Sequence, residues 1–191
     1  MNTYEPPLED IKFILHQFLN ISKKEIEGYN ELTSDFTDSI LSEAGKLAKE
    51  VIAPTNKDGD EIGCVLENGI VRTPESFKEA FKKMCEGGWT SLDIEEEFGG
   101  QNLPLVLSTL VNEMFTSSNM ALCMYNGLTR GAYSAILSHG SAEQKSFICL
   151  KITILLIFSK SYIYSRIKNK PVFRSFVSLN CRFKSFTFSW R

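Results

Sequence analysis

The sequence has 191 residues, enough for one domain with a sizeable core, and its formal net charge is −2. Its five cysteines are odd in number and form no C-x-x-C pair, which argues against a disulfide framework and against a zinc cluster. The strongest apolar run, ITILLIF at 152–158, is far shorter than the ~20 residues of a membrane-spanning helix.

The small net charge conceals two segments of opposite character. Residues 1–150 contain 12 Lys and Arg, 23 Asp and Glu, and all 12 glycines. Residues 151–191 contain nine Lys and Arg, nine aromatic residues and no acid. Such an acid-free run is rare, because acids make up about 12% of ordinary protein. The break predicts two pieces of different origin, an acidic body and a basic aromatic tail.

The first half of the body is predicted to contain two helices. Apolar residues recur at helical spacing over 8–20, which predicts a short amphipathic helix. A longer helix is predicted from a cap at Thr33 or Ser34 to the stop at Pro54. The stretch TNKDGDEIG, residues 55–63, is expected to be a polar connection.

The second half is predicted to contain one hairpin and three further helices. An Asn-Gly pair within CVLENGIVR, residues 64–72, suits a tight hairpin turn because both residues tolerate positive φ. A Thr-Pro opening and a Gly-Gly stop bound a helix over 74–86. Two more helices are predicted, one beginning near Pro104 and one over about 120–138. The body is therefore predicted to be all-α, a helical bundle with one small hairpin.

Local motifs for metal and nucleotide chemistry fail on inspection. The stretch DGDEIGCVLENG has Ile62 at the fifth position of a calcium loop and Gly69 at the twelfth, where oxygen ligands are required. His16 and His139 have no second ligand at metal-binding spacing and are interpreted as structural. The run Glu95–Glu97 is interpreted as a solvated turn. Without a G-x-S-x-G elbow, a phosphate loop or a G-x-G-x-x-G motif, no metal or nucleotide site is predicted.

The tail, residues 151–191, leaves two interpretations open. Its basic residues are interleaved with aromatic ones, a pattern that could contact a nucleic-acid backbone and its bases or an anionic membrane. Because the tail shows no sustained helical or alternating pattern, we favour accidental translation, such as a shifted reading frame in an AT-rich gene. We therefore expect neither a nucleic-acid partner nor a membrane span.

The amino terminus, MNTYEPPLEDIKF, has no basic segment followed by an apolar core, so no signal peptide is expected. Cysteines that stay unpaired fit a reducing compartment. The expected location is the cytoplasm.

Four stretches of the body, taken in order along the chain, carry a resemblance. They are YEPPLEDIKF at 4–13, GGWTSLDIEEEFGGQNLP at 87–104, NMA and MYNGLTRGAY within 119–133, and GSAEQK at 140–145. Together they resemble the amino-terminal half of the acyl-CoA dehydrogenase family, in particular its longer bacterial branch. The second stretch is the most specific, being similar to the family's turn between helices of the first domain. The resemblance covers about residues 3–150.

This resemblance implies a reaction and a set of binding residues. In the family, a carboxylate base removes a proton from the carbon α to an acyl-CoA thioester while a hydride leaves the β carbon for N5 of FAD. Full-length relatives form homo-oligomers. The matching segment implies that Tyr125, Asn126, Gly127, Leu128 and Thr129 line the acyl chain, although their spacing equally suits plain helix packing. No catalytic, flavin-binding or metal-binding residue is assigned.

The departures from the family pattern lead to the main hypothesis. In the family, the segment after the Glu-Gln-Lys motif passes into a β-domain that holds the flavin, and a third, helical domain supplies the catalytic glutamate. The sequence after Lys151 has nothing comparable. We therefore expect a truncated, inactive fragment with an extension helix at 1–30, a family-like helical domain at 31–150 and a non-family, irregular tail at 151–191. The alternative hypothesis is a non-catalytic helical module that uses the basic tail to contact a membrane or nucleic acid.

Overall fold

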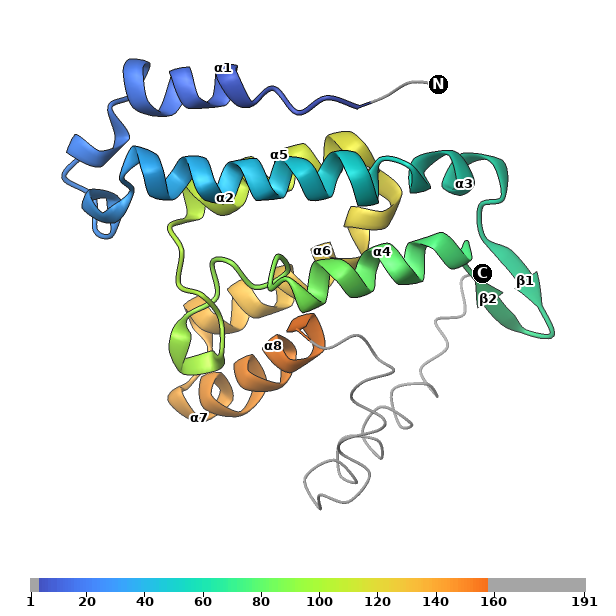
Figure 1. Ribbon diagram of the computed structural model, residues 1–191. Coiled ribbons are helices and arrows are strands. Elements are labelled where there is room, and N and C mark those ends of the chain that lie inside the picture. The colour runs from blue at the N-terminus through green and yellow to red at the C-terminus, as the bar shows by residue number, and fades with distance from the viewer. Residues whose placement is uncertain (1–3, 158–191) are drawn as a thin grey trace, which may run out of the picture.

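The computed structural model describes residues 4–157 and shows an assembly of helices with one small hairpin (Figure 1). The α-helices are α1 (Leu8–Lys12), α2 (Ser34–Leu47), α3 (Thr55–Glu61), α4 (Glu75–Glu86), α5 (Leu105–Ser118), α6 (Met120–His139), α7 (Ala142–Gln144) and α8 (Leu150–Ile157). Turns of π-helix follow α1, α2 and α7 at Phe13–Phe18, Ala48–Ile52 and Lys145–Cys149. Short 3₁₀ turns lie at Ile21–Lys23, Tyr29–Glu31 and Glu96–Phe98, and the strands are β1 (Val65–Glu67) and β2 (Ile70–Arg72). The predicted all-α class with one hairpin is confirmed.

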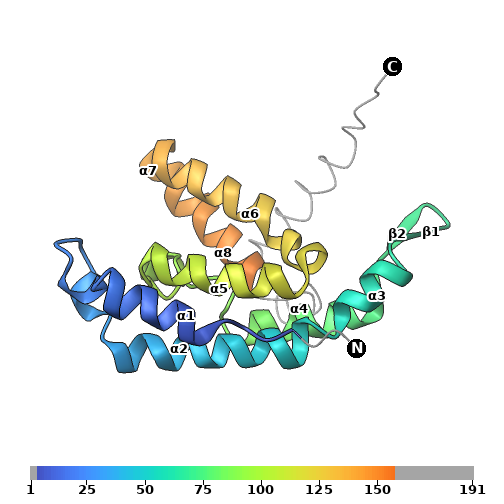
Figure 2. The same ribbon diagram turned by 90° about the horizontal axis from the view of Figure 1, so that it is seen from above.

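The helices bury two apolar clusters. In the larger one, α2 packs on α5 and α5 on α6, around fully buried side chains such as Leu41, Val111 and Leu122. Seen from above, α1 lies beside α2, while α6 and α8 lie on the opposite side of α5 (Figure 2). The smaller cluster joins α6 to α8 around Tyr133 and Cys149. Because α6 contributes to both clusters, it is the central element of the fold.

Side-chain caps begin three of the helices where the sequence places capping residues. The Thr33 hydroxyl accepts from the backbone N–H of Phe36 at 3.4 Å, at the start of α2. Asn119 caps α6 through Oδ1. At α7, Ser141 and Gln144 form a reciprocal capping box, each side chain bonded to the other residue's backbone N–H. These caps satisfy backbone donors that the first helical turn leaves open, so local sequence sets these boundaries.

The predicted hairpin is confirmed at the predicted turn. Asn68 and Gly69 both have positive φ, 51° and 76°, and the residues Glu67 and Ile70 on either side of them pair across the two strands. The hairpin projects away from the helices beyond the end of α3 (Figures 1 and 2). All six strand residues are exposed.

The polar connection predicted at 55–63 is corrected, because most of it forms the helix α3. Its first residue, Thr55, is buried, donates to the Ile52 carbonyl at 2.7 Å and accepts from the Asn119 side chain at 2.8 Å. Gly59 lies so close to the Phe77 ring that a Cβ there would be 2.7 Å from Cζ. These are contacts with α4 and α6, so tertiary packing stabilises a helix that the polar composition does not favour.

The helix that starts at Ala142 passes residue 150, the expected end of the family-like domain, and continues as α8 to Ile157. Thr153 and Leu156 on this extension are buried, and the Thr90 hydroxyl donates to the Leu156 carbonyl. The first seven residues of the predicted tail are thus part of the helical fold. The remainder, residues 158–191, lies outside the described residues, so an irregular tail stays a prediction there.

Candidate functional site

The five predicted acyl-chain residues lie consecutively on α6. Their burial differs: Leu128 is 90% exposed and Tyr125 43% exposed, Gly127 is exposed, and Asn126 and Thr129 are half-buried. A helix turns about 100° per residue, so five consecutive residues surround the whole helix and a single pocket contacts only some of them. Tyr125, Leu128 and Thr129 share one face, at i, i+3 and i+4. Their role in acyl binding stays a prediction.

The exposed side of the first half of α6, from Met120 to Thr129, is largely apolar and carries no charge. Met120, Met124 and Leu128 follow one another at intervals of four residues and are 61%, 65% and 90% exposed. Gly127 and Gly131 lie in open space on the same helix, since a Cβ on either would meet nothing within 4 Å. A run of exposed apolar side chains on one helix is unusual for a surface that faces only water.

Two rings of α4 hold Tyr125 in place. Its ring lies 6.2 Å from the Phe77 ring in an edge-on arrangement and 5.9 Å from the Phe81 ring in a tilted one. The sequence places both phenylalanines on the inner face of α4, but nothing in their spacing links them to Tyr125. Sequence reasoning therefore missed them as neighbours of the candidate site.

The loop between α4 and α5 is fastened to α6 by two polar contacts. Arg130 forms an ion pair with Asp93, in which the two side chains are only 25% and 17% exposed. Three residues later on α6, the Tyr133 hydroxyl donates to the Glu95 carboxylate. Burial, together with the negative charge of Glu95, holds the pKa of Tyr133 well above its ordinary value. Arg130 is the one Lys or Arg of α6, and a lone cation in an uncharged helix is the signal that could have indicated a partner.

The interpretation of Glu95–Glu97 as a solvated turn is therefore corrected for its first residue. Glu95 is half-buried and bonded to Tyr133, whereas Glu96 and Glu97 are exposed as expected. Backbone bonds fold the loop back on itself, including Asn102 N–H to the Ile94 carbonyl at 2.8 Å. Gly100 permits this fold, because a Cβ there would lie 2.1 Å from the Ile94 carbonyl oxygen.

A small cavity opens between this loop and the second half of α6. Its volume is ≈ 280 Å³, and its walls include Asp93, Leu103, Arg130 and Ser134. Ligand pockets usually measure ~300–1,000 Å³, so this cavity lies just below that range.

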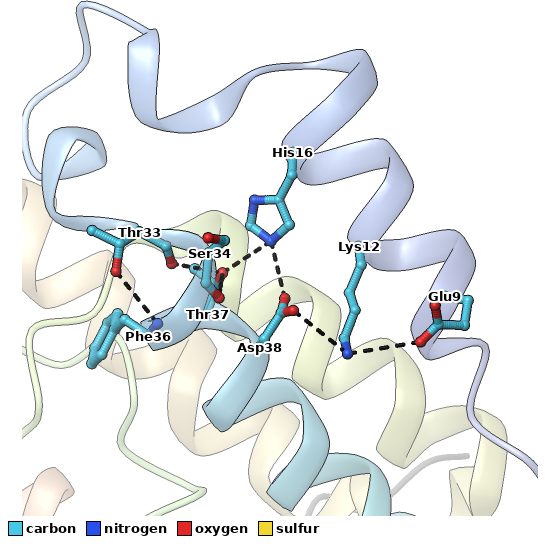
Figure 3. A network of polar contacts seen from close by, with 8 residues as sticks. All are labelled: Glu9, Lys12, His16, Thr33, Ser34, Phe36, Thr37 and Asp38. Atoms are coloured by element: carbon cyan, nitrogen blue, oxygen red, sulfur yellow. Dashed lines mark hydrogen bonds and ion pairs between the residues drawn. The ribbon is translucent and has the colours of Figure 1, made fainter.

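Neither histidine lies in a metal site. Among residues 4–157, no three or more His, Cys, Asp or Glu side chains gather at a distance suited to a metal ion. His16 Nε2 lies 3.0 Å from Asp38 Oδ1 and 3.2 Å from the Thr37 hydroxyl (Figure 3). Thr37 gives its own hydrogen to backbone carbonyls, so both partners accept and Nε2 carries the hydrogen. His16 therefore joins the π-helical turn that follows α1 to the helix α2. The other histidine, His139, is exposed.

The thiols of the described residues are free, and those within the helices are unreactive. Burial raises the pKa of Cys85 to about 11 and that of Cys123 to about 12, and it also raises the pKa of Cys149. A thiol with so high a pKa stays protonated near neutral pH and is a poor nucleophile.

Sequence comparison identifies the family. A family model for the acyl-CoA dehydrogenase N-terminal domain matches residues 34–153. The chain belongs to the acyl-CoA dehydrogenase family. The match ends three residues beyond the predicted limit of 150 and includes α2 to α7 and the first residues of α8.

Individual relatives agree with this assignment. The chain is 35% identical over 151 residues to a 3-methylmercaptopropionyl-CoA dehydrogenase of Ruegeria pomeroyi, which covers 78% of the chain and 26% of the relative. It is 31% identical over 143 residues to a butyryl-CoA dehydrogenase of Syntrophomonas wolfei, covering 72% and 23%. It is 30% identical over 154 residues to the broad-specificity linear acyl-CoA dehydrogenase FadE5 of Mycobacterium tuberculosis, covering 78% and 25%. The chain thus spans about a quarter of the length of these relatives.

The cavity between the α4–α5 loop and α6 is a poor fit for FAD. The cavity of ≈ 280 Å³ is small for a dinucleotide. Its cation, Arg130, is already paired with Asp93, and Glu95 adds a further negative charge at Tyr133. A flavin pyrophosphate in this cavity would therefore meet a cation that is already paired and the carboxylate of Glu95.

Two further expectations concern membranes and the tail. No helix among residues 4–157 is long and apolar enough to cross a membrane. The alternative function, contact of the basic tail with a membrane or nucleic acid, rests on residues outside those that the structure describes.

Proposed function

We propose that the helical body is the first part of a flavin-dependent acyl-CoA dehydrogenase and that α6 forms one wall of its acyl-chain pocket. The single observation that carries this proposal is the open, uncharged face of α6, where Leu128 is 90% exposed. Removing apolar surface from water contributes about 25 cal/mol of binding free energy per Å². An acyl chain that lies on this face would therefore be bound by the burial of apolar surface. Membership of the family supports the same ligand.

Within this wall, Tyr125, Leu128 and Gly127 have different roles. The ring of Tyr125 is fixed by Phe77 and Phe81 and offers a rigid surface. Leu128 offers a flexible apolar side chain, and Gly127 lets a ligand approach the main chain closely. The chain's own contribution is to bind the acyl group, orient it and exclude water from it.

The redox chemistry needs groups that these residues do not supply. Bound FAD would supply the acceptor for the hydride that leaves the β carbon of the thioester in the family reaction. The carboxylates of Glu95 and Asp93 contact side chains of α6, and both are committed to these partners, Tyr133 and Arg130. We infer that the 191-residue chain by itself neither holds FAD in a defined site nor oxidises acyl-CoA.

We further propose that the sequence departs from the family soon after residue 150 because the reading frame changed. The composition break and the end of the family match at 153 support this proposal. Translating the gene around codon 150 in the other two frames tests it directly. Flavin-domain sequence in one of these frames is the expected result, and its absence from both would contradict a frameshift.

We place the protein in the cytoplasm, and the unpaired buried thiols Cys85 and Cys149 support a reducing compartment.

Two measurements test the proposed function. The purified chain is expected to show no visible flavin absorbance and no oxidation of butyryl-CoA; stoichiometric flavin or turnover would overturn the inactivity. To test the acyl wall, residues 4–150 would replace the matching region of the Syntrophomonas butyryl-CoA dehydrogenase. A chimera that retains flavin should oxidise acyl-CoA, and Leu128→Asp should raise its KM for acyl thioesters at least about tenfold by placing a charge in the apolar wall. A chimera that retains flavin but whose KM is unaffected by Leu128→Asp would contradict the assignment of α6.

A further inference from the structure

We propose that residues 158–191 dock on the apolar face of α6, defined here as Met120, Met124, Tyr125 and Leu128, and cover it within the same chain. This inference goes beyond the proposed function, because it names a second occupant for a face that an acyl chain would otherwise contact. It concerns the protein without flavin or thioester, so it can fail while the proposed function holds.

The apolar face of α6 is largely exposed to solvent. Its four side chains are 61%, 65%, 43% and 90% exposed, and they lie on adjoining rows of one helix. Between Met120 and Thr129, α6 carries no charged residue that would hydrate this surface. Contiguous exposed apolar surface of this kind marks an interaction site in a folded protein.

Charge favours the carboxyl-terminal segment as the occupant. Residues 4–157 contain 13 Lys and Arg against 23 Asp and Glu, whereas residues 158–191 contain eight Lys and Arg and no acid. The helix α3, which packs against α6, carries Asp58, Asp60 and Glu61, of which Glu61 is paired with Lys57. A cationic segment that approaches α6 is therefore attracted by the net negative charge of the body, which includes Asp58 and Asp60.

The apolar content of the segment matches the face. Residues 158–191 include nine aromatic residues. Aromatic side chains bury large areas, and methionines such as Met120 and Met124 adapt their shape to aromatic rings. The same segment thus provides both the charge and the apolar surface that the site requires.

The described chain ends within reach of the face. Leu156 is bonded to Thr90, just after α4, and Tyr125 packs on Phe77 and Phe81 of the same helix. From Glu86 back to Phe77 is about 14 Å along the helix. The 34 residues that follow Ile157 could extend to ~110 Å, so length does not limit docking.

A second copy of the body is a poorer occupant. Two bodies that each carry 23 acidic and 13 basic residues repel one another. A tethered segment needs no second molecule and acts at an effective concentration in the millimolar range. The intramolecular contact is therefore favoured at ordinary protein concentrations.

Oxidation of methionine provides the test, because a covered thioether reacts more slowly with dissolved peroxide. The full chain and a variant ending at Ile157 would be treated alike, and oxidation of each methionine followed by mass spectrometry. Met120 and Met124 are expected to react roughly fivefold faster, or more, in the shortened variant. Met84 and Met114, 3% and 1% exposed, are the internal controls and should react slowly in both proteins.

If the shortened chain fails to fold, a full-length variant with all eight Lys and Arg of 158–191 replaced by Gln provides a second test. In this variant, peroxide should oxidise Met120 and Met124 faster than in the unaltered chain. High salt should likewise raise the oxidation rate of both methionines in the unaltered chain. Equal rates in the full, shortened and Gln-substituted chains would overturn the proposal. A different result would also overturn the proposal: slow oxidation of Met120 and Met124 only at high protein concentration, together with a dimer mass by light scattering. That result would show that a second copy of the chain covers the face.

Discussion

The amide of Asn119 donates to the hydroxyl of Thr55, 64 positions earlier in the chain, with 2.8 Å between Nδ2 and Oγ1. Its other amide atom, Oδ1, accepts from the backbone N–H of Leu122 at 3.0 Å and caps α6. One buried side chain therefore joins the start of α3 to the start of α6. Because α6 carries the apolar face, this contact fixes where that face begins.

Replacing Asn119 should lower stability by more than the loss of a surface cap. Asn119→Ala removes the cap and leaves the buried Thr55 hydroxyl without its donor, and we expect a loss of about 2–3 kcal/mol. Urea denaturation followed by circular dichroism measures it. Thr55→Val, which removes only the partner hydroxyl, should cost less than Asn119→Ala. Equal stability of Asn119→Ala and the unaltered chain would show that neither bond matters.

The ion pair between Asp93 and Arg130 should contribute measurably, because both side chains are mostly shielded from water. A double-mutant cycle with Asp93→Asn and Arg130→Gln is expected to give a coupling energy of about 1–2 kcal/mol. The exposed pair Lys57–Glu61, with side chains 74% and 62% exposed, is a matched control that should give only about 0.3–0.5 kcal/mol. Similar coupling in both cycles would contradict a structural role for the first pair.

Stability should fall at alkaline pH in part because of two thiols. Burial raises the pKa of Cys85 from 9.0 to about 11 and that of Cys123 to about 12, so the folded state keeps protons that the unfolded chain loses. Their contribution is therefore fully present below pH 9.0 and is lost as pH rises through about 11 and 12. Urea midpoints compared between neutral and alkaline pH measure this slope. The double variant Cys85→Ala, Cys123→Ala should show a shallower slope, and an unchanged slope would assign the pH dependence to other groups.

Two glycines should respond in opposite directions to the same substitution. Gly100→Ala forces a Cβ to within 2.1 Å of the Ile94 carbonyl oxygen and should destabilise the protein by about 2 kcal/mol or more. Gly127→Ala, inside α6 and in open space, should stabilise it by about 0.5–1 kcal/mol through helix propensity. Thermal and urea unfolding of both variants check the signs. A stabilising Gly100→Ala would show that the loop does not fold back on Ile94.

The two parts of the predicted tail should behave differently when removed. A chain ending at Ile157 should keep its helical content by circular dichroism and change chiefly in solubility. A chain ending at Cys149 also loses the buried Leu156 and the acceptor of Thr90, and its unfolding free energy should drop by about 3 kcal/mol. Comparison of the two truncations by urea unfolding separates these effects. A cooperative loss of helix in the longer variant would show that residues after 157 belong to the fold.

Local patterns in the sequence determined much of this protein by themselves. The cap at Thr33, the hairpin turn at Asn68 and the apolar spacing of each long helix act over a few residues, so the sequence alone predicts them. The four ordered stretches likewise indicated the family that the comparisons show.

Only the tertiary structure decided the features that depend on distant partners. The helix α3, the buried state of Glu95 and the continuation into α8 rest on Thr55–Asn119, Glu95–Tyr133 and Thr90–Leu156, pairs that are 64, 38 and 66 positions apart. The exposure of the α6 face is of the same kind, since spacing alone does not tell which side of an apolar helix packs inward. Burial is a property of the assembled chain, because it depends on surfaces brought together across the whole sequence.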